Sequence, residues 1–210
     1  MATSTSLICP ATGAHADWRA ALPTLTGSLV TLRDLRVTDA LPLFALLTAD
    51  EVTRFISPPP ATVDRFERFI EWSHDQRAAG QIACFAIAPR GGDVPVGIFQ
   101  IRSLETGFAN AEWGFAIGSR YWGTGFFVEG ARLVVDFTFD VLGAERLEAR
   151  AAVANGRGNA ALGKIGGVLE CVLRASFLRQ RRHHDQALWT ILRDDWRESK
   201  TTCGPHAVLH

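Results

Sequence analysis

The chain contains 210 residues, 47% of them hydrophobic, and its 22 basic residues balance its 22 acidic residues. This size and composition predict one soluble domain with a sizeable core, and the neutral balance excludes a global field that would attract nucleic acid or an anionic membrane. No apolar run reaches the roughly 20 residues of a membrane span, and residues 1–18 lack the basic and apolar regions of a secretory signal.

Hydrophobic periodicity and turn residues divide the chain into strands and helices. We expect flexible tails over residues 1–24 and 198–210, on either side of one domain over 25–197. Strands are predicted over residues 29–35, 82–88, 94–104, 110–117, 145–153, 168–177 and 186–193. Helices are predicted over residues 39–48, 63–80, 126–142 and 159–165. Three prolines at 58–60 separate the first two helices, and Gly143 is suited to a left-handed cap after the third.

The segment Arg120–Gly125, with the sequence RYWGTG, joins a predicted strand to the longest apolar helix. Two glycines two residues apart allow a close approach of backbone N–H groups to a ligand. The helix that begins at Phe126 adds the partial positive charge of its N-terminus. The segment therefore predicts a phosphate or pyrophosphate site, and the alternative is a tight turn that binds nothing.

This segment lacks the defining residues of dinucleotide and P-loop motifs. Its Arg-x-x-Gly-x-Gly pattern resembles the acetyl-CoA pyrophosphate loop of the GNAT superfamily of N-acetyltransferases. Residues Tyr121–Glu129 are similar to the Y-W-G-x-G-[YF]-x-x-E run of the branch that acetylates ribosomal-protein N-termini and related amines. That branch also has an N-x-x-S-x-x-x-L-x-K-x-G-F run, which is matched here by Asn155, Leu162, Lys164 and Gly166. The resemblance covers about residues 25–197.

The chain departs from this pattern at two positions. Gly158 stands where the family has a serine, so a hydroxyl that could touch the cofactor or protonate the leaving thiolate is missing. Gly167 stands where the family has a phenylalanine, so an aromatic plug of the core is missing. Both departures bear on the efficiency of catalysis more than on the fold.

The resemblance implies an α/β (α+β) GNAT fold with a mixed, mostly antiparallel sheet and helices on both faces. It also implies that strands 110–117 and 145–153 splay apart and that the pantetheine arm of acetyl-CoA lies between them. Backbone N–H groups near Phe115–Ile117 would then serve as oxyanion donors. The residues expected to bind the cofactor are Phe115, Ala116, Ile117, Arg120, Trp122, Gly123, Thr124, Gly125, Phe126 and Asn155.

Glu112 is the one ionisable side chain inside its strand and is our candidate for the catalytic general base. An amine attacks only when neutral, so a carboxylate in reach can take its proton. The alternative is a structural role, in which Glu112 is solvated or bound to an arginine. Asn155 likewise has two interpretations, a contact with the pantetheine amides or a helix cap. Glu129 lies within one turn of the glycine loop and is placed to orient it.

The activity predicted is transfer of acetyl from acetyl-CoA to a primary amine of a protein N-terminus or small molecule. The alternative is a CoA-binding sensor or interaction module with weakened catalysis, which Gly158 supports. The expected partners are acetyl-CoA and the amine, without nucleic acid, membrane or metal, and a homodimer is left open. His183–Asp185 could suggest a metal, but adjacent ligands on a strand or turn point apart and no spaced partner exists. Basic residues near 174–182 form either a solvated loop or a wall that attracts an acidic acceptor. Scattered cysteines predict a reduced, cytoplasmic protein.

Overall fold

The computed structural model of the protein describes residues 17–179 and 181–202. The strands within these ranges are β1 (Leu25–Thr26), β2 (Val30–Asp34), β3 (Ile82–Pro89), β4 (Gly97–Ser103), β5 (Asn110–Ile117), β6 (Arg146–Ala152), β7 (Val168–Arg179) and β8 (Arg182–Leu192). The α-helices are α1 (Ala40–Leu47), α2 (Asp50–Thr53), α3 (Val63–Ala78), α4 (Phe126–Asp140), α5 (Gly156–Lys164) and α6 (Arg193–Thr202). Two short 3₁₀ turns, η1 (Val37–Asp39) and η2 (Ser119–Tyr121), precede α1 and the glycine loop.

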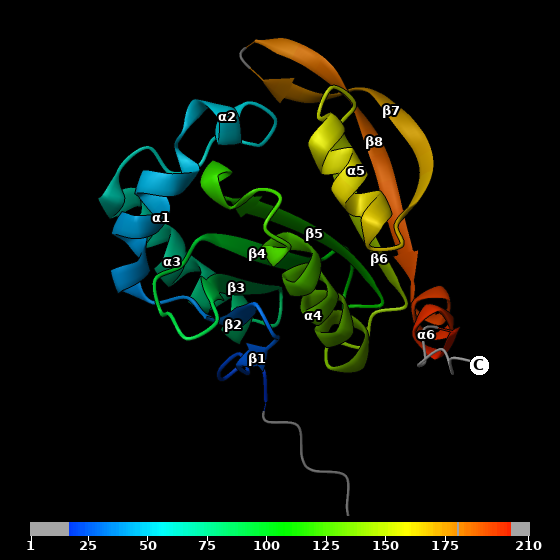
Figure 1. Ribbon diagram of the computed structural model, residues 1–210, viewed down its shortest axis with the longest axis horizontal. Coiled ribbons are helices and arrows are strands. Elements are labelled where there is room, and N and C mark those ends of the chain that lie inside the picture. Colours follow the sequence, from blue (N-terminus) through cyan, green and yellow to red (C-terminus); the bar gives the residue numbers. More distant parts are fainter. Residues whose placement is uncertain (1–16, 180, 203–210) are drawn as a thin grey trace, which may run out of the picture.

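The strands form one sheet in the order β1-β2-β3-β4-β5-β6-β8-β7 (Figure 1). Neighbouring strands are antiparallel except β5 and β6, which are parallel. Alternate residues of β3 show that helices cover both faces of the sheet. Phe85 packs edge-on against Phe137 of α4, whereas Cys84 and Ala86 join the cluster formed with α1 and α3. This architecture confirms the predicted α/β fold with a mixed, mostly antiparallel sheet.

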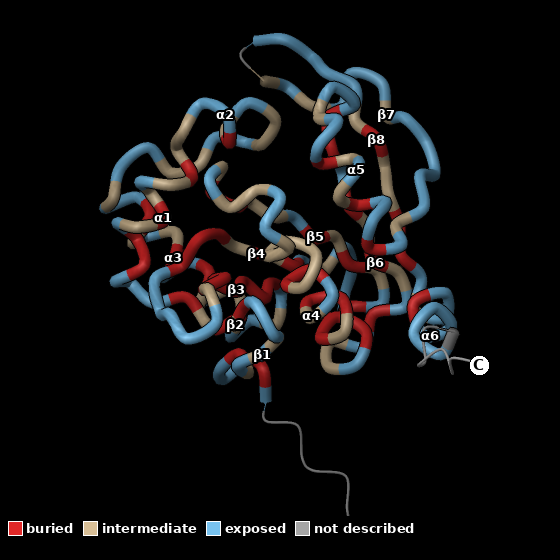
Figure 2. The backbone as a smooth tube through the Cα atoms, in the orientation of Figure 1, coloured by how far each residue is buried: buried red, intermediate tan, exposed pale blue. Residues whose placement is uncertain are grey.

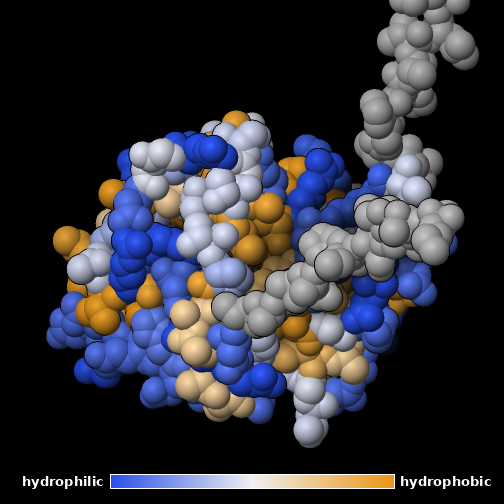
Figure 3. Space-filling model, turned by 90° about the horizontal axis from the view of Figure 1, so that it is seen from below, coloured by the Kyte–Doolittle hydropathy of each residue, from blue (hydrophilic) through white to orange (hydrophobic). Residues whose placement is uncertain are grey.

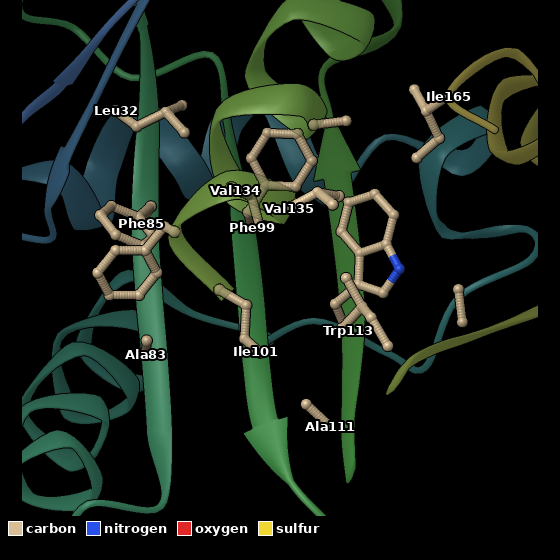
Figure 4. Packing of buried hydrophobic residues seen from close by; sticks show 14 of the residues in the cluster. Leu32, Ala83, Phe85, Phe99, Ile101, Ala111, Trp113, Val134, Val135 and Ile165 are labelled. Atoms are coloured by element: carbon tan, nitrogen blue, oxygen red, sulfur yellow. The ribbon is translucent and has the colours of Figure 1, made fainter. Parts of the chain in front are cut away.

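The main core lies between α4 and the central strands, because α4 presents a wide apolar surface to them. Trp113 on β5 stacks on Phe99 of β4, and Val134 and Val135 of α4 lie on the same side of the sheet (Figure 4). Buried residues accordingly follow the central strands and the inner side of α4 (Figure 2). The alternation read from residues 110–117 is therefore the pattern of a strand with a packed helix on one face.

Several elements were absent from the sequence prediction. The helix α2 has only four residues, too few for a periodic pattern, and β1 has only two. The helix α6 is almost entirely polar, and its buried apolar side chain is Trp196, whose indole N–H donates to Asp136 at 2.7 Å. One buried anchor does not make an apolar stripe, so no helix was predicted there.

The packed part of the chain begins earlier and ends later than the sequence analysis placed it. Trp18 and Leu22 lie within the expected N-terminal tail, yet both are buried in the main core. The Trp18 ring packs edge-on against Phe108 with 5.4 Å between centroids. Helix α6 extends from Arg193 to Thr202, into the expected C-terminal tail. The remainder of the expected tails, residues 1–16 and 203–210, lies outside the described residues.

The sheet divides where β5 and β6 separate. Their pairing covers only Asn110–Glu112 against Arg146–Glu148, although β4 pairs with β5 from Ala111 to Ile117. Beyond Glu112, the side of β5 that faces β6 therefore has no strand against it in the described sheet. The predicted splay is present, and it leaves backbone groups of β5 available to a ligand.

The surface seen from below carries hydrophilic residues with separate hydrophobic patches between them (Figure 3). Among residues 17–179 and 181–202, no helix combines the length and the apolar character needed to cross a membrane.

Candidate functional site

A cavity of about 570 Å³ opens where β5 and β6 separate. Its floor is the end of β5, and its walls are the glycine loop with the first turn of α4, the helix α5, and the α2 segment, which we define as Glu51–Ile56. Figure 1 shows α2 and α5 on opposite sides of this opening. Seven of the predicted cofactor residues line the cavity: Phe115, Ala116, Ile117, Trp122, Gly123, Gly125 and Asn155.

Both glycines of the loop adopt a backbone conformation that favours glycine. Gly123 and Gly125 have φ values of 79° and 88°, in the left-handed region that L-residues rarely occupy. Gly125 is the residue that opens α4, so this left-handed turn aims the helix N-terminus at the cavity. The Trp122 indole N–H donates to Ile117 O at 2.9 Å and ties the loop to the end of β5. This geometry suits a bound anion.

Three predicted cofactor residues do not line the cavity. The Arg120 guanidinium lies over the Tyr121 ring and borders a separate hollow of about 290 Å³ beside α1. The Thr124 hydroxyl donates to Tyr121 O at 2.8 Å and so closes the loop. The Phe126 ring stacks on Tyr121 with 5.9 Å between centroids. The side chains of these three residues contact the loop and its surroundings. The backbone of the loop is therefore the part that is available to a ligand.

Asn155 caps α5 and also borders the cavity. Its side-chain oxygen accepts the N–H of Gly158 at 3.0 Å, which is the helix-cap role left open by the sequence. A Cβ at residue 158 would lie 2.5 Å from the Asn155 side-chain nitrogen. Glycine at this position therefore leaves room for the Asn155 side chain to cap α5. At the other end of α5, the Trp189 indole approaches Gly163 and Gly167 and occupies the space beside them.

Cationic side chains outnumber acidic ones around the cavity. Arg54, Arg157 and Lys164 line it, and the Arg157 guanidinium lies 4.5 Å from the centre of the Trp122 ring. The acidic residue of the lining, Glu51, accepts a hydrogen bond from the Ser119 hydroxyl at 2.7 Å. This bond holds the pKa of Glu51 below its ordinary value. The cavity is therefore positively charged and complements an anionic ligand.

Glu112 is the last residue of β5 that pairs with β6, and it is not among the residues that line the cavity. Its carboxylate binds the guanidinium of Arg102 and lies 3.6 Å from that of Arg150, and its side chain is only 15% exposed. These contacts correspond to the alternative in which an arginine holds Glu112. Glu112, the candidate base, therefore lies in the paired part of β5 and β6, just before the two strands separate.

The hairpin of β7 and β8 extends toward α2 (Figure 1). The Arg179 guanidinium donates to Thr53 O at 3.1 Å, a contact between residues 126 positions apart. Arg174, Arg181 and Arg182 are exposed. Asp185 accepts the N–H of Ala175 at 2.7 Å, so it has a structural partner. Within the described residues, no three His, Cys, Asp or Glu side chains are grouped as a metal site would require.

Sequence reasoning missed the α2 segment and the cations Arg157 and Lys164 as parts of the site. Lys164 was noted only as a matching position in the family pattern. The signal available for α5 was its helical spacing, since residues 157, 161 and 164 fall on one face. For α2 no local signal existed, because only the tertiary fold brings it opposite α5.

Known proteins share both the sequence pattern and the architecture of this chain. Residues 30–168 match the family described as "Acetyltransferase (GNAT) domain". Over 176 residues, the chain is 26% identical to p20, an uncharacterized N-acetyltransferase of Bacillus licheniformis, and the match covers 83% of this chain and 99% of p20.

Two solved structures illustrate the shared architecture. A GCN5-related N-acetyltransferase from Brucella melitensis superposes with a TM-score of 0.73 and 22% identity, over 85% of this chain and 82% of that one. The ribosomal-protein-S5-alanine acetyltransferase of Vibrio fischeri superposes with a TM-score of 0.74 and 14% identity, over 83% and 98% of the two chains. At these identities the likeness shows the fold alone.

Proposed function

Because the chain belongs to the GNAT acetyltransferase family, we propose that it transfers an acetyl group from acetyl-CoA directly to a primary amine of a protein N-terminus or a small molecule. The observation that carries this proposal is the cavity between the separated strands β5 and β6, which ends at a glycine loop and a helix N-terminus. A long, anionic thioester substrate needs both features, a channel for its arm and donors for its phosphates.

The residues of the cavity fit coenzyme A in chemical type. Backbone N–H groups of Gly123–Phe126 would bind the pyrophosphate, since both glycines hold the loop in the required conformation. Arg157 and Lys164 would complement the remaining phosphate charge. The unpaired side of β5 near Phe115–Ile117 would bind the pantetheine amides and polarise the thioester carbonyl. When bound, acetyl-CoA supplies an activated acyl group with a thiolate as its leaving group.

The acceptor amine would enter between the α2 segment and the β7–β8 hairpin. Val52, Phe55 and Ile56 supply apolar surface on this side of the cavity, and Arg179 joins the hairpin to the segment. A neutral amine is needed for attack. Glu112 is our proposed general base, and it would act on the amine through water because it stands outside the cavity lining.

The second candidate function is a CoA-binding sensor without efficient catalysis. Two observations favour it: residue 158 offers no hydroxyl, and Glu112 is engaged by arginines. Both functions require that the protein bind acetyl-CoA, and they differ in whether thiol is released when an amine is present.

Two measurements on the purified full chain test these functions in order. Acetyl-CoA should raise the melting temperature, because a ligand that binds only the folded state stabilises it by about 2.7 kcal/mol at a hundredfold excess over Kd. Thiol release should then be measured against peptide N-termini, amino acids and polyamines. Thiol release with one of these amines supports the enzyme. Stabilisation without thiol release from any of them supports the sensor, and an unchanged melting temperature overturns both.

A further inference from the structure

Glu129, in the first turn of α4, binds the turn between β1 and β2. Its carboxylate accepts the backbone N–H groups of Ser28 at 2.8 Å, Leu29 at 2.6 Å and Val30 at 2.8 Å, and it also accepts the Ser28 hydroxyl. Three successive N–H groups that converge on one carboxylate form an anion-binding nest. The two partners are about one hundred residues apart in the sequence, so this contact is a tertiary one.

The turn, defined here as Gly27–Val30, has the space that this carboxylate needs. A Cβ on Gly27 would overlap the Glu129 carboxyl group, so the close approach requires glycine. Arg90 holds the turn from the other side, since its guanidinium donates to Gly27 O at 2.5 Å and its backbone N–H donates to Leu29 O at 2.8 Å. The turn is thus fixed both to α4 and to the end of β3.

The charge of Glu129 is retained in this setting. Burial alone would raise the pKa of Glu129, but the hydrogen bonds from Ser28, Leu29 and Val30 outweigh burial and hold it below its ordinary value. An ionised carboxylate in the first turn of a helix would otherwise compete with a bound pyrophosphate for the positive end of that helix. The three N–H groups of the turn offset this charge, which leaves the N-terminus of α4 free to attract an external anion.

The same turn lies against the glycine loop. The Leu29 side chain ends 3.1 Å from the place that a Cβ on Gly125 would occupy. Gly125 is the left-handed residue that opens α4 and lines the cavity. Displacement of the turn would therefore move the Leu29 side chain away from Gly125 and remove the packing that supports this residue.

We propose that Glu129 is a positioning residue, which clamps the Gly27–Val30 turn onto the glycine loop so that Gly125 and the start of α4 keep the geometry that binds the pyrophosphate of acetyl-CoA. The inference rests on the proposed function, because it assigns Glu129 a part in binding the same co-substrate. Glu129 does not itself line the cavity, so its effect passes through the turn and Leu29.

The test is acetyl-CoA affinity, measured by calorimetry on the full chain for Glu129→Gln and for a matched control. The amide nitrogen of glutamine would oppose N–H donors of the turn, so we expect Kd to rise about tenfold while kcat at saturating acetyl-CoA stays within about twofold. The control is Asp136→Asn on the same helix, whose carboxylate binds Trp196 and Lys200 away from the cavity. It should lower the melting temperature and leave Kd unchanged.

A second variant keeps the test informative if Glu129→Gln does not fold. Leu29→Ala retains all four hydrogen bonds to Glu129 and removes only the side chain that meets Gly125, and it should also raise Kd. The clamp is overturned if a folded Glu129→Gln protein binds acetyl-CoA as the wild type does, if Leu29→Ala leaves Kd unchanged, or if Asp136→Asn weakens binding equally. Failure of the wild type to bind acetyl-CoA would instead overturn the proposed function.

Discussion

At the scale of single residues, the backbone conformation of Gly125 shapes the part of the glycine loop that lines the cavity. Gly125 has a φ of 88°, and its neighbour Gly123 has a φ of 79°, so both glycines stand where any L-residue is strained. The surroundings of the two differ, because a Cβ on Gly123 would meet open space whereas one on Gly125 would meet Leu29. Gly125 is therefore the more sensitive of the two positions.

Gly125→Val should weaken acetyl-CoA binding at least about tenfold, since the positive φ costs a branched residue about 1–3 kcal/mol and the loop would rearrange to relieve it. Far-UV circular dichroism should stay native. The matched control is Gly107→Val, at a loop glycine with a φ of 80° and open space around it, outside the cavity lining. The Gly107→Val protein should have a similar backbone strain, and its affinity for acetyl-CoA should be unchanged. Full affinity in a folded Gly125→Val protein would remove the glycine loop from the site.

Glu112→Gln tests the proposed base. The variant should keep its affinity for acetyl-CoA and lower kcat/KM at neutral pH, with partial recovery at alkaline pH, where the amine is already neutral. The control is Glu148→Gln on β6, a carboxylate of the same cluster that contacts Arg146 and Arg150. An identical pH–rate profile in the two variants and the wild type would assign Glu112 to structure, in keeping with its contacts to Arg102 and Arg150.

At the scale of elements, a polar contact adds to the backbone pairing that joins the last two strands to the sheet. Glu170 on β7 accepts two hydrogen bonds of 2.7 Å from Arg146 of β6 and one of 2.9 Å from Thr190 of β8. The residues of β7 are mostly exposed, so few apolar contacts fix this strand. The contact thus joins three neighbouring strands, two of which form the hairpin that extends toward α2.

The stability of this part should depend on acid pH through Glu170. The Arg146 guanidinium, with Thr190, lowers the pKa of Glu170 from 4.5 to about 2. A depressed pKa contributes stability above pH 4.5 that is lost as pH falls toward 2. Glu170→Gln should therefore lower the melting temperature at neutral pH and flatten its decline in this acid range. Asp64→Asn, at an exposed carboxylate of α3, serves as the control. If the melting temperature of Glu170→Gln fell with acid pH as it does in the wild type, Glu170 would not be the source of this pH dependence.

At the scale of the whole molecule, the side of the cavity that we propose for the acceptor lies near two distant parts of the chain that contact each other. The α2 segment belongs to the first third and the β7–β8 hairpin to the last, and the Arg179 contact with Thr53 joins them. Arg54 lines the cavity, and Arg182 is exposed at the end of the hairpin. Among the described residues that line the cavity, the acidic one is Glu51, and it is bound to Ser119. An acceptor that entered on this side would therefore meet mainly positive charge.

We expect this charge to disfavour polyamines and aminoglycosides as acceptors. A peptide N-terminus or an amine that carries a carboxylate would instead gain a charge-assisted partner. Competition between the two classes should be measured at low and high salt, because screening weakens the preference of an exposed cleft. Arg54→Gln should reduce the preference as salt does. Efficient acetylation of a polyamine, with no activity on monoamines or peptides, would contradict this assignment.

Local sequence determined the framework of the site. Hydrophobic periodicity predicted β5 with its observed bounds, and the RYWGTG run predicted a glycine turn before α4, which the structure shows to be left-handed at both glycines. Both follow from short-range rules, side-chain period in a strand and the backbone freedom of glycine, which need no knowledge of the rest of the chain. The resemblance built on these residues led to the family that the comparison then showed.

Tertiary structure alone decided which side chains meet at the site. Arg120 belongs to the motif but turns toward α1, whereas α2 had no sequence signal and forms a wall of the cavity. The partners of Glu112 come from β4 and β6, and those of Glu129 from a turn about one hundred residues away. The physical reason is that a sequence pattern reports contacts within a few residues, while charge pairing and cavity lining depend on elements brought together only by packing of the sheet and its helices.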